Sequence, residues 1–274
     1  MRALAIRIVS WVTVFACTSA TAVPLGAQTA PDPQPPRSSS GEAEFFPVGE
    51  HLDYGIALGR MRLGEATMRV EEKVSLEGTV VYRTSLRIDI GAAVLDYEVG
   101  LESWIEPSPF RSRVFQRREP GETRQVENYR FHPGDRRADL EVRDVESGAV
   151  LSRRRLDGLP VDALDELAAL FLLRTLSLAP DETLRLRRYF DPSAELVEFT
   201  RVRAEEIRVP AGRYETVVYR TVIGALAAFQ AERNPLVYVS DDEDRLIVQI
   251  ETDTPVGRLR MYLVDERVLG GSGT

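Results

Sequence analysis

The sequence has 274 residues, 43% of them hydrophobic and 28% charged, which is enough apolar material for a folded core and excludes wholesale disorder. Its 35 Lys and Arg are outnumbered by 43 Asp and Glu, and the formal net charge of -8 argues against nucleic acid as the main partner. One Cys and two His argue against a disulfide framework, thiolate–zinc sites and catalytic pairs built on Cys or His.

The N-terminus has the features of a secretory signal peptide over residues 1–27. Two arginines precede the apolar stretch Ile8–Ala16, which is too short to span a bilayer. Small residues allow cleavage after Ala22 or after Ala27, and we favour Ala27. The sequence therefore predicts export to the periplasm or the cell exterior.

Cys17 offers an alternative end to this signal. Val14-Phe15-Ala16-Cys17 would be a lipobox, with Cys17 acylated and the protein anchored to a membrane. Bulky Phe15, however, occupies a position where such sites usually carry a small residue. We therefore expect cleavage without lipid attachment.

Composition divides the remaining chain into three parts. Residues 28–44 are rich in Pro, Ser and Gly and have no apolar periodicity, which predicts a disordered linker. A single β-rich domain is expected over residues 45–266. Residues 267–274 are expected to form a flexible tail.

Period-two alternation dominates the domain. In the clearest run, the apolar series is Val80, Tyr82, Thr84, Leu86, Ile88 and Ile90, and the polar series between them is Val81, Arg83, Ser85, Arg87 and Asp89. Turn signals separate such runs at Glu77-Gly78, Pro120-Gly121, Pro133-Gly134-Asp135, Ser147-Gly148, Pro210-Ala211-Gly212 and Asp241-Asp242. More than ten short strands at this spacing predict an antiparallel sheet that folds over as a barrel, half-barrel or sandwich.

One segment, residues 162–178, instead predicts a helix of about five turns. Asp162 is the expected N-cap, Asp165 and Glu166 lie in the first turn, and Pro180 follows the end. Beyond the first turn, apolar residues occupy most of the circumference: Leu164, Leu167, Leu170, Phe171, Leu172, Leu173 and Leu176. A helix of this kind is buried. The predicted fold class is therefore mainly β, an antiparallel curved sheet, half-barrel or barrel-like, closed around one buried apolar helix.

An outer-membrane barrel would show the same strand alternation. Its polar lumen, however, would not receive an apolar helix. The stretch Phe199–Arg208 also carries charges on both faces, and an Arg near the bilayer midplane costs roughly 2–4 kcal/mol. We therefore do not expect an integral membrane protein.

Five short motifs stand out by their order and spacing. They are Phe46-Pro-Val-Gly-Glu-His-Leu-Asp-Tyr54, Gly64-Glu-Ala66, the helix end Phe171-Leu-Leu-Arg174, Val209-Pro-Ala-Gly-Arg-Tyr214, and Tyr238-Val-Ser-Asp-Asp242 with Arg245. From about Phe45 to Val264, this series resembles the DUF3108 family of exported bacterial proteins. The resemblance implies export and a β-rich fold similar to the half-barrels of the lipoprotein carriers LolA and LolB. It implies no catalytic residues, because the family has no established biochemical function.

Three polar features suggest chemistry but have simpler interpretations. The acidic run Asp241–Asp244 offers oxygen ligands for Ca²⁺, but it lacks the alternating spacing and central Gly of a calcium loop, which favours a solvated hairpin turn. Ser240 has no base beside it and is not expected to act as a nucleophile. His51 and His132 fall on different strands, so no metal site is predicted.

The remaining candidates are aromatic residues and one glycine. Trp104, Tyr129, Phe199 and Tyr219 are candidates for a sugar-stacking or lipid groove, although core or strand-face positions are the favoured interpretation. Gly212 is expected to take a positive φ in a turn of structural importance. The sequence thus names no catalytic residue, metal ligand or cofactor, and leaves the ligand-binding residues unknown.

Two functions remain. The first is an exported periplasmic or envelope-associated protein that binds a lipid or other amphiphile in the half-barrel. The alternative is a structural or protein-interaction module of the cell envelope, with a solid core and no ligand, that uses a sheet edge or its acidic outer face. An enzyme is not expected, because no general base lies in a recognisable motif.

Overall fold

A computed structural model describes residues 46–92, 95–119, 124–187, 196–221, 235–254 and 257–268. The expected signal peptide with Cys17, the linker over 28–44 and the Pro120-Gly121 turn lie outside the described residues. Within them the structure is mainly β, with one α-helix and a short 3-10 turn, Pro133–Asp135.

The strands run from β1 to β14 along the chain. Their bounds are β1 Glu50–Leu58, β2 Met61–Leu76, β3 Thr79–Ala92, β4 Leu95–Pro107, β5 Phe110–Glu119, β6 Gln125–His132, β7 Arg137–Asp144, β8 Val150–Asp157, β9 Thr183–Arg187, β10 Leu196–Val209, β11 Gly212–Thr221, β12 Leu236–Ser240, β13 Ile247–Thr254 and β14 Gly257–Val268. The helix, α1, spans Glu166–Thr175. Strand β14 includes Arg267 and Val268, which the sequence placed in the tail.

All fourteen described strands belong to one antiparallel sheet. Its order is β8-β7-β6-β5-β4-β3-β2-β1-β14-β13-β12-β11-β10-β9. Each strand therefore lies beside its neighbours in sequence, except that β8 and β9 are separated, and the β1–β14 seam joins the first strand to the last. Among the described residues β8 and β9 are the two edges and do not pair with each other, so the sheet is open. The predicted antiparallel curved sheet is confirmed.

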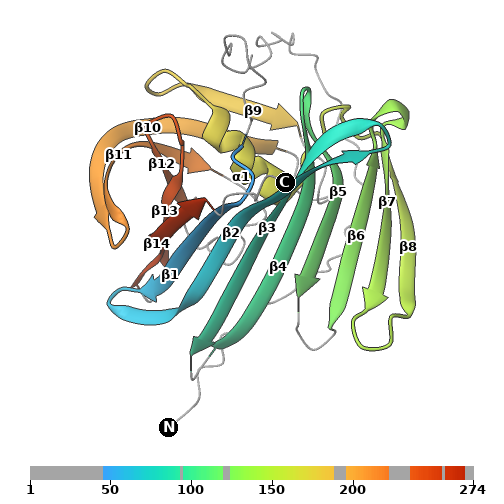
Figure 1. The fold of residues 1–274 in the computed structure, drawn as a ribbon, viewed down its shortest axis with the longest axis horizontal. Helices are drawn as coiled ribbons and strands as arrows, with labels where there is room; N and C mark the ends of the chain where they lie inside the picture. Colours follow the sequence, from blue (N-terminus) through green and yellow to red (C-terminus); the bar gives the residue numbers. More distant parts are fainter. Residues whose placement is uncertain are drawn as a thin grey trace, which may run out of the picture. The chain divides into compact units, whose positions relative to one another are not determined.

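Helix α1 connects these two edges in the sequence and lies in the curve of the sheet (Figure 1). To pass from β8 to β9 the chain must cross a face of the sheet, and an apolar helix can do so in the interior because its backbone hydrogen bonds are satisfied internally. It contacts β3, β4 and β5. Every residue from Glu166 to Arg174 is buried, which confirms the prediction of a buried apolar helix.

The helix is shorter than predicted and begins three residues later. Its N-cap is Asp165 and not Asp162: Asp165 Oδ1 accepts the Ala168 N–H at 2.8 Å. Two serines of the sheet fix this choice, since Ser103 Oγ donates to Asp165 Oδ2 at 2.6 Å and Ser112 Oγ accepts the Asp165 N–H at 2.7 Å. The helix stops at Thr175 after less than three turns.

The strands follow the predicted alternation over most of their length and are longer than expected. At the start of β3 the prediction is wrong, since Val80 is 45% exposed and Val81 is 0% exposed. On β3, Leu86, Ile88 and Ile90 are at most 3% exposed, whereas Arg87 and Asp89 are exposed. Strand β2 runs for 16 residues and β10 for 14. Such lengths fit a curved sheet because β-bulges bend the strands, as between Val70 and Glu72 on β2.

The predicted turns that lie within the described residues connect successive strands. Glu77-Gly78 joins β2 to β3, Ser147-Gly148 joins β7 to β8, and Asp241-Asp242 joins β12 to β13. Gly212 opens β11 after its turn, but its φ of +159° is close to extended backbone. The expected positive φ is confirmed, at the extended limit of that range.

Candidate functional site

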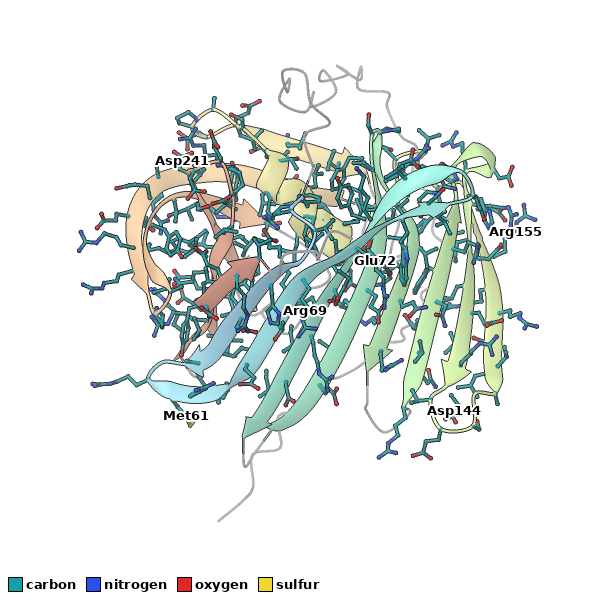
Figure 2. The ribbon with its side chains drawn as sticks, in the orientation of Figure 1. Met61, Arg69, Glu72, Asp144, Arg155 and Asp241 are labelled. Carbon is teal, nitrogen blue, oxygen red and sulfur yellow. The ribbon has the colours of Figure 1, made fainter. Side chains whose placement is uncertain are left out.

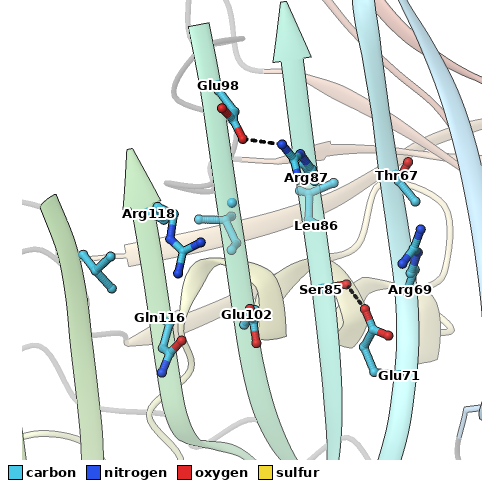
Figure 3. Close-up of a pocket in the computed structure, with 13 residues that line it drawn as sticks. Thr67, Arg69, Glu71, Ser85, Leu86, Arg87, Glu98, Glu102, Gln116 and Arg118 are labelled. Atoms are coloured by element: carbon cyan, nitrogen blue, oxygen red, sulfur yellow. Dashed lines mark hydrogen bonds and ion pairs between the residues drawn. The ribbon is translucent and has the colours of Figure 1, made fainter. Parts of the chain in front are cut away.

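The outer face of the sheet, opposite the core, carries a hollow of about 270 Å³ over β2–β6, which we call the outer hollow (Figure 3). Its charged lining residues occupy outward positions on four adjacent strands. They are Arg69 and Glu71 on β2, Arg87 on β3, Glu98 and Glu102 on β4, and Arg118 on β5. Alternation places these polar side chains outward because their neighbours along each strand fill the core.

The floor of the outer hollow is Gly100, at the middle of β4. Strand register places Arg87 opposite Gly100 on one side and Arg118 opposite it on the other. Adjacent strands lie about 4.8 Å apart, so the two arginine backbones are roughly 10 Å apart across the glycine. A Cβ atom at Gly100 would meet only Arg118 Cβ, at 3.9 Å. The missing side chain thus opens space between two guanidinium groups.

A β-bulge brings a further carboxylate to the rim. Between Val70 and Glu72 strand β2 carries one extra residue, Glu71, relative to β3. The bulge interrupts the alternation, so that Glu71 lies on the outer hollow and Glu72 also reaches an outward arginine, Arg83, at 3.2 Å. Ser85 Oγ donates to Glu71 Oε1 at 2.7 Å and fixes its position.

Some charges of the outer hollow are already paired. Arg87 Nη2 lies 2.6 Å from Glu98 Oε1 (Figure 3), and Arg83, beside the hollow, donates to Glu102 Oε2 at 2.8 Å. The hydrogen bond to the Glu102 carboxylate is the main reason that the pKa of Arg83 is raised. These pairs neutralise two of the three carboxylates that line the hollow.

Arg69 and Arg118 remain. Both side chains are exposed, and neither guanidinium group has a hydrogen bond or ion pair with any other residue that the structure describes. Within the hollow they face one carboxylate that lacks a described cationic partner, that of Glu71. Guanidinium groups present several N–H donors in a planar fork and have no acceptor. The outer hollow therefore offers unused donors to a ligand that supplies anionic or strongly accepting oxygens.

A second polar cluster lies inside the fold, at the C-terminal end of α1. Arg174 donates to both carboxylate oxygens of Glu50 on β1, at 2.6 and 2.7 Å, and both side chains are at most 3% exposed. Arg245 donates to the carbonyl oxygens of Arg174 and Leu176 at 3.1 and 2.8 Å. These carbonyls are left unpaired when a helix ends, so Arg245 anchors α1 to the β12–β13 turn.

The acidic run Asp241–Asp244 forms the predicted hairpin turn between β12 and β13. Asp242 Oδ1 accepts the Ser240 hydroxyl at 2.6 Å and the Arg245 N–H at 3.1 Å. Ser240 Oγ in turn accepts the Leu246 N–H at 2.7 Å. The turn thus holds Arg245 in place against the helix end.

The four aromatic candidates do not come together. Phe199, Tyr219 and Tyr129 are 0%, 1% and 7% exposed and belong to the core. Trp104 lies on β4, where the guanidinium of Arg83 lies 5.4 Å from the centre of its ring. The favoured interpretation of core and strand-face positions is confirmed.

The two histidines also lie apart, each beside an aspartate. His51 Nε2 is 2.9 Å from Asp53 Oδ1, and His132 Nε2 is 2.9 Å from Asp139 Oδ2. Over the described ranges, no three His, Cys, Asp or Glu side chains are placed to hold a metal ion together. In the same ranges no helix has the length and apolar character needed to cross a membrane.

The residues of the outer hollow were missed by sequence reasoning, which assigned no ligand site. One signal was available: Gly100 interrupts an otherwise alternating strand, and a glycine inside a strand marks a missing side chain or a close approach. The pairing of Gly100 with Arg87 and Arg118 depends on strand register across three strands. That register is not contained in any local pattern.

The fold and its hollow define a curved, open antiparallel sheet around a buried helix, with a polar site on the outer face. The sequence matches the family described as "Protein of unknown function (DUF3108)" over residues 52–264. The chain therefore belongs to the DUF3108 family. No curated protein matches it.

Solved structures with a similar trace come from Brucella abortus, Parabacteroides distasonis and Bacteroides fragilis. A β-barrel-like DUF1849 protein from Brucella abortus has 10% identity and a TM-score of 0.48, covering 82% of this chain and 99% of its own. A candidate lipoprotein from Parabacteroides distasonis has 10% identity and a TM-score of 0.31, covering 81% and 98%. A candidate exported protein with a YmcC-like fold from Bacteroides fragilis has 12% identity and the same TM-score and coverage. Likeness at this level does not bear on the activity of this chain.

Proposed function

We propose that this protein is an exported binding protein, without catalytic activity, that recognises a small anionic group in the outer hollow. One observation carries the proposal: Arg69 and Arg118 line a concavity over Gly100 and have no partner among the described residues. A carboxylate or phosphate group supplies the acceptors that two guanidinium groups require. Export rests on the signal-peptide features of residues 1–27.

The size of the hollow limits what it takes. Pockets for drug-sized ligands usually measure about 300–1,000 Å³, so 270 Å³ suits a small molecule or the end group of a larger one. In the ion pairs Arg87–Glu98 and Arg83–Glu102 the arginines neutralise the carboxylates, which therefore repel an incoming anion less. On the β2 side of the hollow, the carboxylate of Glu71 repels anions and so disfavours a multiply charged one.

If the ligand is an amphiphile, we expect its headgroup, and not its acyl chain, to bind in the outer hollow. On the inner face around α1, Leu52, Ile56 and Leu170 are 0% exposed, so an acyl chain could reach them only by displacing packed side chains. An acyl chain would therefore lie elsewhere, while an anionic headgroup and a soluble anion share the chemistry of the outer hollow. The binding experiment has to separate these two sources.

The test is a titration of the mature protein with two kinds of probe. Inorganic phosphate and acetate represent soluble anions, and vesicles of phosphatidylglycerol, compared with phosphatidylcholine vesicles, represent headgroups. We expect saturable binding of one anionic group per chain that weakens as salt rises. Arg69→Gln with Arg118→Gln is expected to weaken it at least tenfold, because a hydrogen bond to a charged group contributes about 1.5–3 kcal/mol.

Two variants make the result specific. Gly100→Leu fills the floor without changing any charge and is expected to abolish binding while the circular dichroism spectrum stays native. Arg208→Gln removes an exposed arginine of β10, which is not part of the outer hollow, and is expected to change nothing. Equal binding by the wild type, the double arginine variant and Gly100→Leu would contradict the proposal.

A further inference from the structure

The second surface of interest is β8, the edge of the sheet that lies farthest from the β1–β14 seam. Among the described residues β8 pairs with β7 alone. Seven of its eight residues are exposed and only Leu156 is half-buried. Its outward backbone N–H and C=O groups are therefore open to pairing with another strand.

The centre of β8 carries three positive charges in a row. Arg153, Arg154 and Arg155 follow one another, so both faces of the edge carry arginine, and Arg155 projects at the rim of the sheet (Figure 2). Arg153 Nε lies 2.8 Å from Glu141 Oε2 and Arg155 Nε lies 2.8 Å from Asp157 Oδ1. These are surface pairs, and such pairs are weak and readily exchanged.

This charge pattern decides against a second copy of the chain as the partner. If two β8 strands paired antiparallel about their midpoint, Arg153 of each would face Arg154 of the other. If the register moves by one residue in either direction, Arg153 or Arg154 of one copy lies opposite the same arginine of the other copy. Like charges directly opposite in a sheet are destabilising, so the edge resists pairing with itself.

The same pattern favours an acidic strand. Glutamates opposite the three arginines would gain charge-assisted hydrogen bonds on both faces. Val150 and Leu151, which are 37% and 52% exposed, would be covered by β-branched residues of the added strand. Main-chain pairing would supply affinity and the arginines would supply selectivity, as in other cases of strand addition.

We propose that β8 is a docking edge that accepts an extended acidic segment of a partner protein as an added antiparallel strand. This surface is separate from the outer hollow, since no β8 residue lines it. The two sites can therefore be tested independently in one protein.

The test uses the synthetic peptide KVEEETVV, carrying a fluorophore, whose three glutamates face the arginines of β8 when it is read antiparallel. Fluorescence anisotropy with the mature protein is expected to show saturable one-to-one binding. Arg153→Gln, Arg154→Gln and Arg155→Gln together are expected to weaken it at least tenfold. The control Arg69→Gln with Arg118→Gln, which removes cations from the outer hollow, is expected to leave it unchanged.

A second peptide separates strand pairing from simple charge attraction. Methylation of alternate backbone nitrogens removes donors from one edge of the peptide and keeps every charge. We expect this peptide to bind at least tenfold more weakly when the methylated edge is the one that would face β8. Equal binding of both peptides, or binding unaffected by the triple arginine change, would overturn the proposal.

Discussion

Gly64 on β2 lacks a side chain, and this allows β2 and β3 to pair at normal strand spacing. A Cβ atom built there would overlap the carbonyl oxygen of Asp89 and lie 2.8 Å from Ile90 Cα, both backbone atoms of the paired strand β3. Backbone cannot rotate away as a flexible side chain can. The Gly64-Glu-Ala66 motif therefore has a steric explanation in the fold.

Gly64→Ala is expected to destabilise the protein by about 1–3 kcal/mol, the usual cost of overpacking, measured by urea unfolding. Gly91→Ala is the matched control, because a Cβ atom on that glycine of β3 meets nothing within 4 Å. The control is expected to leave stability unchanged or slightly raised. Equal midpoints for Gly64→Ala and the wild type would show that β2 and β3 can separate at no cost.

The motifs through which the sequence resembles its family serve the fold at residue scale. Phe46 packs edge-to-face on Phe171 with ring centres 5.0 Å apart. Glu50 pairs with Arg174, and Arg245 holds the helix end. None of these side chains lines the outer hollow. The motifs therefore identify the architecture, and the proposed binding residues lie outside them.

Helix α1 is the element on which the core depends. Leu170 and Phe171 are 0% exposed, and Phe171 also contacts Phe46. Leu170→Ala or Phe171→Ala is expected to destabilise the protein by roughly 2–5 kcal/mol, as large-to-small changes in packed cores do. Thermal unfolding measures the loss.

Leu151→Ala is the control for this experiment, because Leu151 is 52% exposed on β8 and its loss leaves no cavity. Its effect is expected to stay within about 0.5 kcal/mol. Wild-type unfolding of the Leu170 or Phe171 variant would mean that the helix does not contribute to the cooperative core.

The β7–β8 hairpin is expected to respond to acid. Hydrogen bonds from Arg153 on β8 and from Arg143 lower the pKa of Glu141 on β7. Between the lowered pKa and the ordinary one, the unfolded chain binds more protons than the folded chain, so this contribution to stability is lost as pH falls. Hydrogen exchange of β8 amides should therefore accelerate, relative to those of β3, as pH falls below about 4.5.

Glu141→Gln is the variant that checks this assignment. It removes the titrating carboxylate, so β8 exchange is expected to be faster at neutral pH and to lose most of the acid-dependent difference from β3. An unchanged acid response in this variant would place the sensitivity in another carboxylate of the edge.

The helix also shows that the existence of an element can be predicted from the sequence when its first residue cannot. The apolar circumference of residues 162–178 was enough to predict a buried helix. The choice of Asp165 over Asp162 as N-cap depends on Ser103 and Ser112, which β4 and β5 bring from more than fifty residues away. Both aspartates are equally good caps when only the local sequence is read.

At the scale of the whole molecule, alternation and turn signals predicted an antiparallel curved sheet but not its order. Hairpins such as β2–β3 follow from the Glu77-Gly78 turn. The β1–β14 seam and the open edges at β8 and β9 follow from no local signal, because they depend on how the two halves of the chain meet. The outer hollow shares this limit, since Arg87 and Arg118 lie on either side of Gly100 only when β3, β4 and β5 are in register.

The seam is therefore the feature of the molecule with the greatest consequence for folding. It pairs Leu58 with Leu259 and Glu50 with Val268, so its contacts close a loop of about two hundred residues. Strand β14 also supplies Met261 and Leu263, both 0% exposed, to the core. At roughly 1.5–3 kcal/mol per buried large side chain, these two residues carry a sizeable part of a domain's usual net stability of about 5–15 kcal/mol.

A chain that ends at Thr254, and so lacks β14, is expected to lose cooperative unfolding in urea and to expose apolar surface to a fluorescent dye, because β1 and β13 both become unpaired edges. A chain that ends at Val268 keeps every described strand and is expected to unfold like the full-length protein. Among the described strands the two chains differ only in β14, so a difference in their unfolding is due to that strand. A cooperative transition with native spectrum in the shorter chain would mean that β1–β8 with α1 fold without the seam, and that the two halves of the sheet are independent units.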